Sequence, residues 1–290
     1  MKHILITIAA VVLVGTAFAG PIHNAARDGD LAGVQAELDK GIDVNAKDNI
    51  LSFTPLDWAV KLKKTETIKL LHKHGGKSAA QDSIHIAAKL GNIEAVKKHL
   101  DAGADVNAKR VGSKLTPLDF TKELAASPTM RYMKLPEDTP EIKAAKKEIA
   151  DLLHKRGGKH SSIYEAAIGG DLEGVKEFLA TGVDPDEKTG FAGPKTPLCV
   201  ASTKEVAELL IAKGADVNAV VRNVGTPLGY AAMKGHKEVA ELLIAKGADV
   251  NFAKWMTPLD QANRYKHLET ADLLRKHGGK TKKELEAEGK

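Results

Sequence analysis

The sequence of 290 residues has almost none of the residues that support covalent cross-links or thiolate chemistry. Cys199 is the single cysteine, which excludes an intramolecular disulfide bond and the zinc sites that several thiolates build. It stands between Leu198 and Val200 in a segment that we expect to form a buried helix. In such a position a cysteine packs as a small apolar side chain more often than it acts as a nucleophile. Stability must therefore come from packing.

The sequence also lacks a dominant charge of one sign and is poor in aromatic residues. Its 43 Lys+Arg stand against 38 Asp+Glu, for a formal net charge of +5, and aromatic residues make up only 4% of the chain. The charges are interleaved rather than gathered into the basic stripe that neutralises several phosphates, so we expect no nucleic-acid partner. The 43% of hydrophobic residues suffice for one or two cores of a soluble protein.

Long hydrophobic runs are absent after the first twenty residues. Lys2 precedes an uncharged apolar run over residues 4–17, and small residues at Ala17 and Ala19 form a signal-peptidase site. This pattern predicts a signal peptide over residues 1–19. A membrane anchor is the alternative, but the run is shorter than the roughly 20 residues that a span requires. We expect an exported protein, periplasmic or secreted and of bacterial type, with no membrane span after cleavage.

The remainder of the chain consists of repeats. Thr-Pro-Leu begins five of them, and Thr54 and Gly75 lie 21 residues apart, as do Thr226 and Gly247. Further units align through a pair of alanines at the same position. The repeats begin near residues 20, 54, 82, 116, 161, 196, 226 and 257.

Each unit has the signals of two short helices and a connecting turn. Thr followed by Pro predicts a helix start, and an aspartate three residues later completes a capping box in the units at Thr54, Thr116 and Thr257. A glycine ends the first helix, and a leucine pair on a helical period marks the second. The Ala-Asp-Val-Asn sequence that follows suits a projecting turn. The first-helix glycines are Gly29, Gly91, Gly170 and Gly235.

The repeating pattern resembles the ankyrin repeat, over essentially the whole chain after residue 19. This resemblance implies an all-α solenoid of about eight helix-turn-helix repeats with β-hairpin fingers. It also implies a protein that binds other proteins through its fingers and its concave helix surface, without catalysis.

Changes in the length of the connections between repeats divide the repeats into three groups. The connections after Gly75 and Gly157 are shortened, and we expect repeats 1–2 over residues 20–81, repeats 3–4 over 82–160 and repeats 5–8 over 161–280. A charged C-terminal tail follows over 281–290. An insertion at 124–145, rich in proline, separates the two helices of the fourth repeat, and the sixth repeat is three residues short, which should clip its first helix.

Histidines near the helix ends invite a metal-binding interpretation. His72 and His74 are two residues apart and do not face each other on a helix, and equivalent positions carry Arg156 and Arg275. A cationic residue that interacts with the last carbonyl groups of a helix explains all of them. We therefore expect no metal site, no cofactor and no catalytic residue.

The resemblance places partner contacts on finger tips and on the exposed ends of the first helices in the four C-terminal repeats. Trp255 and Met256 could instead pack against the last repeat. The candidate protein-binding residues are Phe191, Arg222, Asn223, Met233, Lys234, Lys254, Trp255, Met256, Arg264 and Tyr265.

The sequence thus favours an exported, monomeric, non-enzymatic scaffold that binds another protein. Two alternatives stay open at this point. The first is an accessory or metal-dependent enzyme factor of the cell envelope. The second is a protein that binds anionic envelope polymers, which the isoelectric point near 9.0 supports.

Overall fold

The structure is a computed structural model that describes residues 20–49, 51–111, 113–121, 138–188, 195–221 and 225–289. The predicted signal peptide therefore lies outside the described residues, and so does most of the predicted insertion. The chain forms two compact units, Met1–Lys159 and His160–Lys290, which are described separately below.

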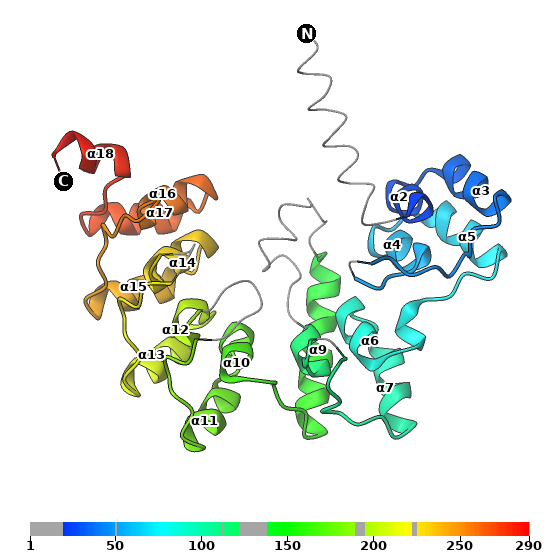
Figure 1. Cartoon of the computed structure of the whole chain (residues 1–290), viewed down its shortest axis with the longest axis horizontal. Helices are drawn as coiled ribbons and strands as arrows, with labels where there is room; N and C mark the ends of the chain where they lie inside the picture. Colours follow the sequence, from blue (N-terminus) through cyan, green and yellow to red (C-terminus); the bar gives the residue numbers. More distant parts are fainter. Residues whose placement is uncertain are drawn as a thin grey trace, which may run out of the picture. The chain divides into compact units, whose positions relative to one another are not determined.

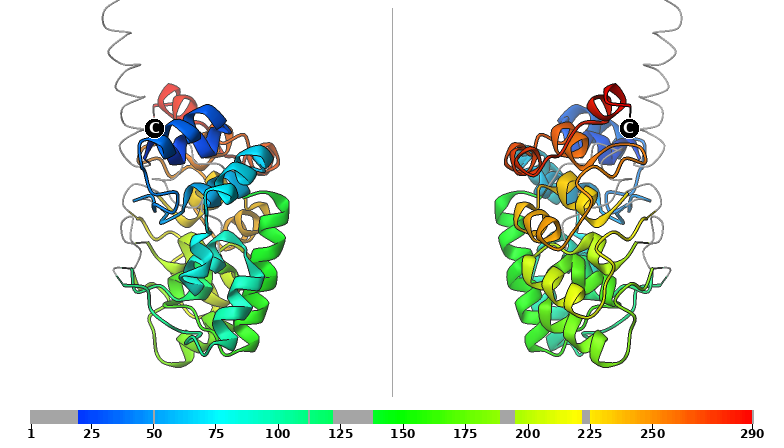
Figure 2. Two further views of the ribbon diagram at one scale, coloured as in Figure 1. Left: turned by 90° about the vertical axis from the view of Figure 1, so that its right-hand side faces the viewer. Right: turned by 90° about the vertical axis from the view of Figure 1, so that its left-hand side faces the viewer.

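The N-terminal unit consists of helical hairpins joined by longer connections (Figure 1). The first helices α2 and α4 contact each other, as do the second helices α3 and α5, so the first hairpin packs against the second (Figure 2). The described elements are α2 (Pro21–Asp28), α3 (Leu31–Asp39), α4 (Pro55–Lys61), α5 (Thr65–Lys73), η1 (Ala79–Gln81), α6 (Ile84–Leu90), α7 (Ile93–Asp101), η2 (Pro117–Thr121) and α9 (Pro140–Lys155).

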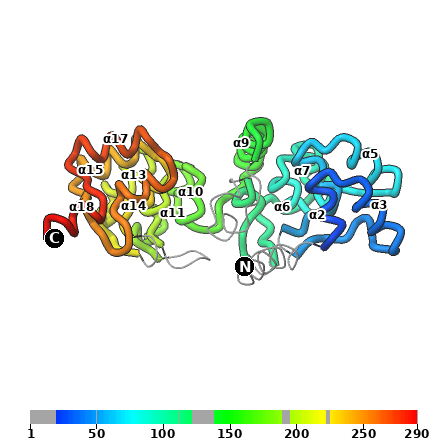
Figure 3. Tube along the Cα trace, turned by 90° about the horizontal axis from the view of Figure 1, so that it is seen from above, coloured from blue at the N-terminus to red at the C-terminus, as the bar shows by residue number. Residues whose placement is uncertain are grey.

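The C-terminal unit has two layers of helices (Figure 3). One layer contains the first helix of each repeat, where α10 contacts α12, α12 contacts α14 and α14 contacts α16. The second helices α11, α13, α15 and α17 contact one another in the same order. The elements are α10 (Ile163–Gly169), α11 (Leu172–Ala180), α12 (Pro197–Val200), α13 (Lys204–Ala212), α14 (Pro227–Lys234), α15 (Lys237–Ala245), α16 (Pro258–Arg264), α17 (Leu268–Lys276) and α18 (Lys282–Ala287).

Capping residues set the helix boundaries as the sequence predicts. Thr54 and Thr257 each form a complete capping box with the aspartate three residues on. Thr116 donates to Asp119 in the same way, at 3.1 Å, although the segment that follows is the 3₁₀ helix η2 rather than an α-helix. Gly235 ends α14 with φ +72, where a β-carbon would lie 2.5 Å from Nδ1 of His267, so both the dihedral angle and the space require glycine.

The core of each unit lies between its helix layers. In the C-terminal unit the leucine pairs of the second helices supply fully buried side chains, such as Leu210 and Leu243. Cys199 is buried in the same cluster, as the sequence predicts. Its helix, α12, has only 4 residues, which confirms the prediction of a clipped first helix in the sixth repeat.

The structure differs from the sequence-based expectation in two places. No strand forms within the described ranges, where the finger of the seventh repeat carries an isolated antiparallel bridge between Val221 and Gly225. Hydrogen bonds run both ways across this bridge, so the backbone turns back on itself without building a ladder. The predicted insertion at 124–145 ends inside a helix, because Pro140 starts the 16-residue α9 behind its N-cap Thr139.

Asparagine side chains connect successive repeats on the loop side. Asn218 donates through Nδ2 to the carbonyl of Gly247 at 3.1 Å and accepts through Oδ1 from the amide of Asp249 at 2.9 Å. Three other asparagines form the same two bonds with the repeat that follows. We call this set the asparagine ladder; its members are Asn45, Asn107, Asn218 and Asn251.

Asp186 occupies the ladder position of the fifth repeat. One carboxylate oxygen, Oδ2, accepts from the amide of Asp216 at 2.9 Å, as an asparagine would. The other oxygen, Oδ1, is buried and has no hydrogen-bond partner. The Asp186 carboxylate therefore forms the hydrogen bond in which the ladder residue accepts, but not the one in which it donates.

Across the described ranges, every helix is too short or too polar to cross a membrane.

Candidate protein-binding surface

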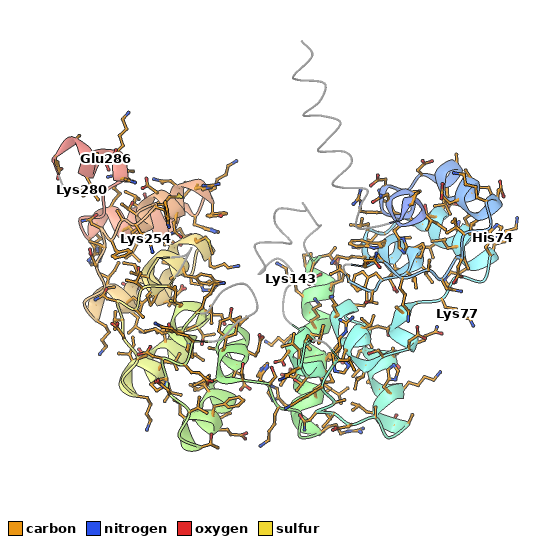
Figure 4. The ribbon with its side chains drawn as sticks, viewed as in Figure 1. His74, Lys77, Lys143, Lys254, Lys280 and Glu286 are labelled. Carbon is orange, nitrogen blue, oxygen red and sulfur yellow. The ribbon has the colours of Figure 1, made fainter. Side chains whose placement is uncertain are left out.

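The predicted contact residues that the structure describes lie on two adjacent repeats of the C-terminal unit. Met233 and Lys234 lie at the C-terminal end of α14, and Arg264 lies at the end of α16, with which α14 is in contact (Figure 1). Lys254 lies in the turn that precedes α16 (Figure 4). Trp255 follows it in the same turn. Phe191, Arg222 and Asn223 lie outside the described residues.

Trp255 is the most prominent apolar side chain of this surface. It is 66% exposed, and Tyr265, which follows α16, is 36% exposed. The exposure of Trp255 argues against the alternative in which its ring packs against the last repeat. An indole left in water at this level has most of its apolar area available for burial against a partner.

The turn that carries Trp255 is held to its own repeat. Nη1 of Arg264 contacts Sδ of Met256 at 3.7 Å, which joins the turn to the end of α16. Nε2 of His267 lies 3.1 Å from the carbonyl oxygen of Met233 and joins the start of α17 to the end of α14. These two contacts link the turn to the end of α16 and the start of α17 to the end of α14.

Two further residues beside the predicted Lys234, namely Lys195 and Tyr230, were not predicted as contacts. The ammonium groups of Lys195 and Lys234 lie 5.4 Å and 5.6 Å from the ring centroid of Tyr230, which is cation–π distance. The sequence could have indicated Tyr230, because an aromatic residue recurs four positions after the helix-capping threonine. Trp58 and Phe120 hold the same position in other repeats.

The buried Cys199 thiol is poorly suited to nucleophilic chemistry. Burial raises the pKa of the Cys199 thiol to about 11, so the thiolate is scarce at neutral pH. Burial also lowers the pKa of Lys195, which is 4% exposed. Both shifts have desolvation as their main cause, and packing of a small apolar Cys199 accounts for its position.

The histidines that suggested a metal lie at helix C-termini, as the cationic-cap interpretation predicts. His74 follows the last residue of α5 (Figure 4). His277 follows the last residue of α17, and His72 lies within the last turn of α5. His154 lies in the last turn of α9. Each can interact with the last carbonyl groups of its own helix.

Comparison with known proteins agrees with the repeat architecture. The family described as ankyrin repeats (3 copies) matches residues 22–110, 163–254 and 223–284. A cattle (Bos taurus) protein named cyclin-dependent kinase 4 inhibitor B is 36% identical over 62 residues, 21% of this chain and 47% of the cattle protein. The chain thus spans about half the length of that relative. Since the family matches cover more than half of the sequence and the helical hairpins recur in register with them, the chain belongs to the ankyrin-repeat family.

Proposed function

We propose that this protein is an exported, non-enzymatic scaffold that binds another protein through the end of α14, the turn before α16 and the end of α16. The exposure of Trp255, at 66%, is the observation that carries the proposal. Repeats of this family typically mediate contacts between proteins. The name of the cattle relative, an inhibitor of a kinase, describes action on a protein target and supports the same class of function.

The chemistry of the surface supports a protein partner. Tryptophan, tyrosine, methionine and arginine are enriched at the centres of protein interfaces, and Trp255, Tyr265, Met256 and Arg264 belong to those types. The Arg264–Met256 contact at 3.7 Å links two of these side chains across the turn. We expect Trp255 to be the anchor.

An affinity pull-down from cell-envelope extract tests the proposal, with the Trp255→Ala variant beside the wild-type chain. Truncating a buried aromatic anchor removes 2 kcal/mol or more, so we expect roughly thirty-fold weaker binding of the captured protein. Val111→Ala is the matched control, because Val111 is 97% exposed and lies in the N-terminal unit. Circular dichroism must show that both variants keep the wild-type helix content.

The two possible failures have different meanings. Unchanged affinity with an intact fold would move the site away from Trp255, and the insertion at 124–145 would be tested next. Lost affinity together with loss of helix content would make Trp255 a structural residue.

The alternative of an anionic polymer partner is tested by salt. The ammonium groups of Lys195 and Lys234 lie 5.4 Å and 5.6 Å from the Tyr230 ring centroid, and their positive charge would attract a polyanion. Binding that falls steeply with ionic strength and survives Trp255→Ala would favour the polymer, because Debye screening weakens exposed charge pairs and leaves apolar burial intact.

Export to the periplasm or the medium is part of the proposal. The basic start, the apolar run and the small residues at Ala17 and Ala19 support it. Intact-mass measurement of the native protein should give Gly20 as the first residue. A native chain that keeps Met1 would contradict export by this route.

A further inference from the structure

Three lysines of the N-terminal unit, Lys61, Lys89 and Lys146, are buried. Lys61 of α4 and Lys146 of α9 both pair with Asp138, and all three side chains are at most 4% exposed. Asp138 thus uses one carboxylate oxygen for each lysine. Its charge is fully shared and offers nothing to a third cation.

A third buried lysine lies beside this group. Lys89 of α6 is 7% exposed, and its ammonium lies 5.6 Å from the ring centroid of Phe53 and 5.7 Å from that of Phe120. The guanidinium of Arg110 lies over the same Phe120 ring at 5.4 Å and donates to Oγ of Ser52 at 2.9 Å. Two cations therefore flank one aromatic ring. We call Phe53, Lys89, Arg110 and Phe120 the Lys89 cluster.

The nearest acidic group is already committed to other donors. Asp48 accepts from the indole of Trp58 at 2.7 Å and from the backbone amides of Leu51 and Ser52. Within the described ranges Lys89 and Arg110 form no ion pair, and ring faces and a hydroxyl are their partners instead. A buried cation without an anion is costly to maintain, so an incoming anion would be stabilised there.

The surroundings of Lys89 are electrostatically positive. Burial lowers the pKa of Lys89 to about 7, and the charges of Arg110, Lys146 and Lys61 lower it as well, against the opposing effect of Asp48. Burial also lowers the pKa of His85, which lies edge-on to Phe120. The charged and titratable groups around the Lys89 cluster are therefore Asp48, Lys61, His85, Arg110, Asp119, Asp138 and Lys146.

We propose that the Lys89 cluster binds the carboxylate of an acidic peptide segment in a partner protein. The proposal rests on the proposed function in one respect, that the natural partner is a protein. Arg110 and Phe120 are only partly buried and form the accessible rim, while Phe53 is fully buried beneath. A guanidinium binds a carboxylate in a bidentate manner, and the methylene groups of glutamate can pack on the exposed part of Phe120.

Binding of a carboxylate should depend on pH in a distinctive way, because Lys89 takes up a proton as the complex forms. A carboxylate beside Lys89 favours the charged ammonium and raises the pKa of Lys89 above its value in the free protein. Below pH 7 the free protein already holds the proton, so affinity is constant there. Above pH 7 binding must recruit the proton, and affinity falls by up to about ten-fold per pH unit.

The test uses the full chain and a capped peptide of sequence Gly-Glu-Glu-Glu-Gly, with its glutamine counterpart and a version that carries one phosphoserine. Carbon-13 spectra of the lysine ε-methylene groups follow the titration of Lys89 at each peptide concentration. We expect the Glu peptide to raise the titration midpoint of Lys89 by at least about one pH unit and the Gln peptide to leave it unchanged.

Variants separate this site from general attraction by surface charge. Lys89→Met should weaken binding of the Glu peptide by about ten-fold or more, and methionine fits because Met233 holds the equivalent position in α14. Lys98→Met removes the same charge from the exposed face of α7 and should have little effect. If Lys89→Met does not fold, Arg110→Gln replaces it and should weaken binding in the same way.

Three results would overturn the proposal. They are an unmoved Lys89 midpoint at saturating Glu peptide, equal losses from Lys89→Met and Lys98→Met, and preferential binding of the phosphoserine peptide, which would make this a phosphate site. None of them depends on Trp255 or on capture of the natural partner. Failure here is therefore distinguishable from failure of the proposed function.

Discussion

Replacing Asp186 by asparagine should stabilise the C-terminal unit. At this position of the asparagine ladder, Oδ2 already accepts from the amide of Asp216, and Oδ1 is buried without a partner. An amide group in place of Oδ1 would donate to the carbonyl of Gly214, in the register by which Asn218 donates to Gly247. The substitution changes no volume and completes a bond that the other repeats already form.

The magnitude follows from the single bond that is added. A hydrogen bond between neutral groups contributes about 0.5 to 1.5 kcal/mol net, and relief of an unsatisfied buried oxygen acts in the same direction. The loss of a charge-assisted bond from the Asp216 amide opposes part of this gain. We expect a net stabilisation of about 1 kcal/mol, which raises the melting temperature by roughly 3 to 5 °C.

Thermal unfolding followed by far-ultraviolet circular dichroism provides the measurement. The reciprocal variant Asn218→Asp is the matched control, because it should remove the donor to Gly247 and lower stability by a similar amount. Equal melting temperatures for Asp186→Asn and the wild type would refute the reasoning. So would an Asn218→Asp variant that is as stable as the wild type.

Three further substitutions test the cores of the two units. Asp138→Asn removes the buried carboxylate that Lys61 and Lys146 share and should destabilise the N-terminal unit by about 3 to 5 kcal/mol in urea titration. Burial favours the neutral acid, but the two lysines outweigh it and hold the pKa of Asp138 below its ordinary value of 3.8, so its contribution is present at neutral pH and is lost as pH falls below that value. Above pH 7 the unfolded chain binds a proton at Lys89 more tightly than the folded chain does. Because rising pH removes this advantage of the unfolded chain, the free energy of unfolding of the N-terminal unit should rise from pH 7 to 9. The Lys89→Met variant should not show this rise. Leu243→Ala should cost the C-terminal unit about 2 to 5 kcal/mol, and hydrogen exchange should show little change over residues 20–77; uniform loss of protection would contradict this.

Local rules of the sequence predicted the helices well. The capping boxes at Thr54 and Thr257 and the left-handed glycines depend on residues within a few positions of each other, which a single sequence displays. The asparagine ladder was not predictable in the same way. Asn218 bonds to a residue 29 positions away, and only the stacking of repeats brings the two together.

The same distinction applies to the candidate sites. The exposure of Trp255 follows from its place in a connecting turn, so the sequence was a sufficient guide. Lys89 could not be identified, because a lysine at the end of an amphipathic helix is ordinarily solvated. Its burial depends on Phe53 and Phe120, which belong to the preceding and following repeats.

Each unit contains one of the two tryptophans of the chain, in opposite surroundings. Trp58 is buried, donates its indole N–H to Asp48 and packs edge-on against Phe53, whereas Trp255 is exposed. The intrinsic fluorescence of the protein is therefore a sum of a short-wavelength component that iodide cannot reach and a long-wavelength component that it quenches. A partner that covers Trp255 would shift the long-wavelength emission and protect it from iodide. Unfolding in urea would instead change the short-wavelength emission of Trp58. The unlabelled chain thus reports on binding and on unfolding at separate wavelengths.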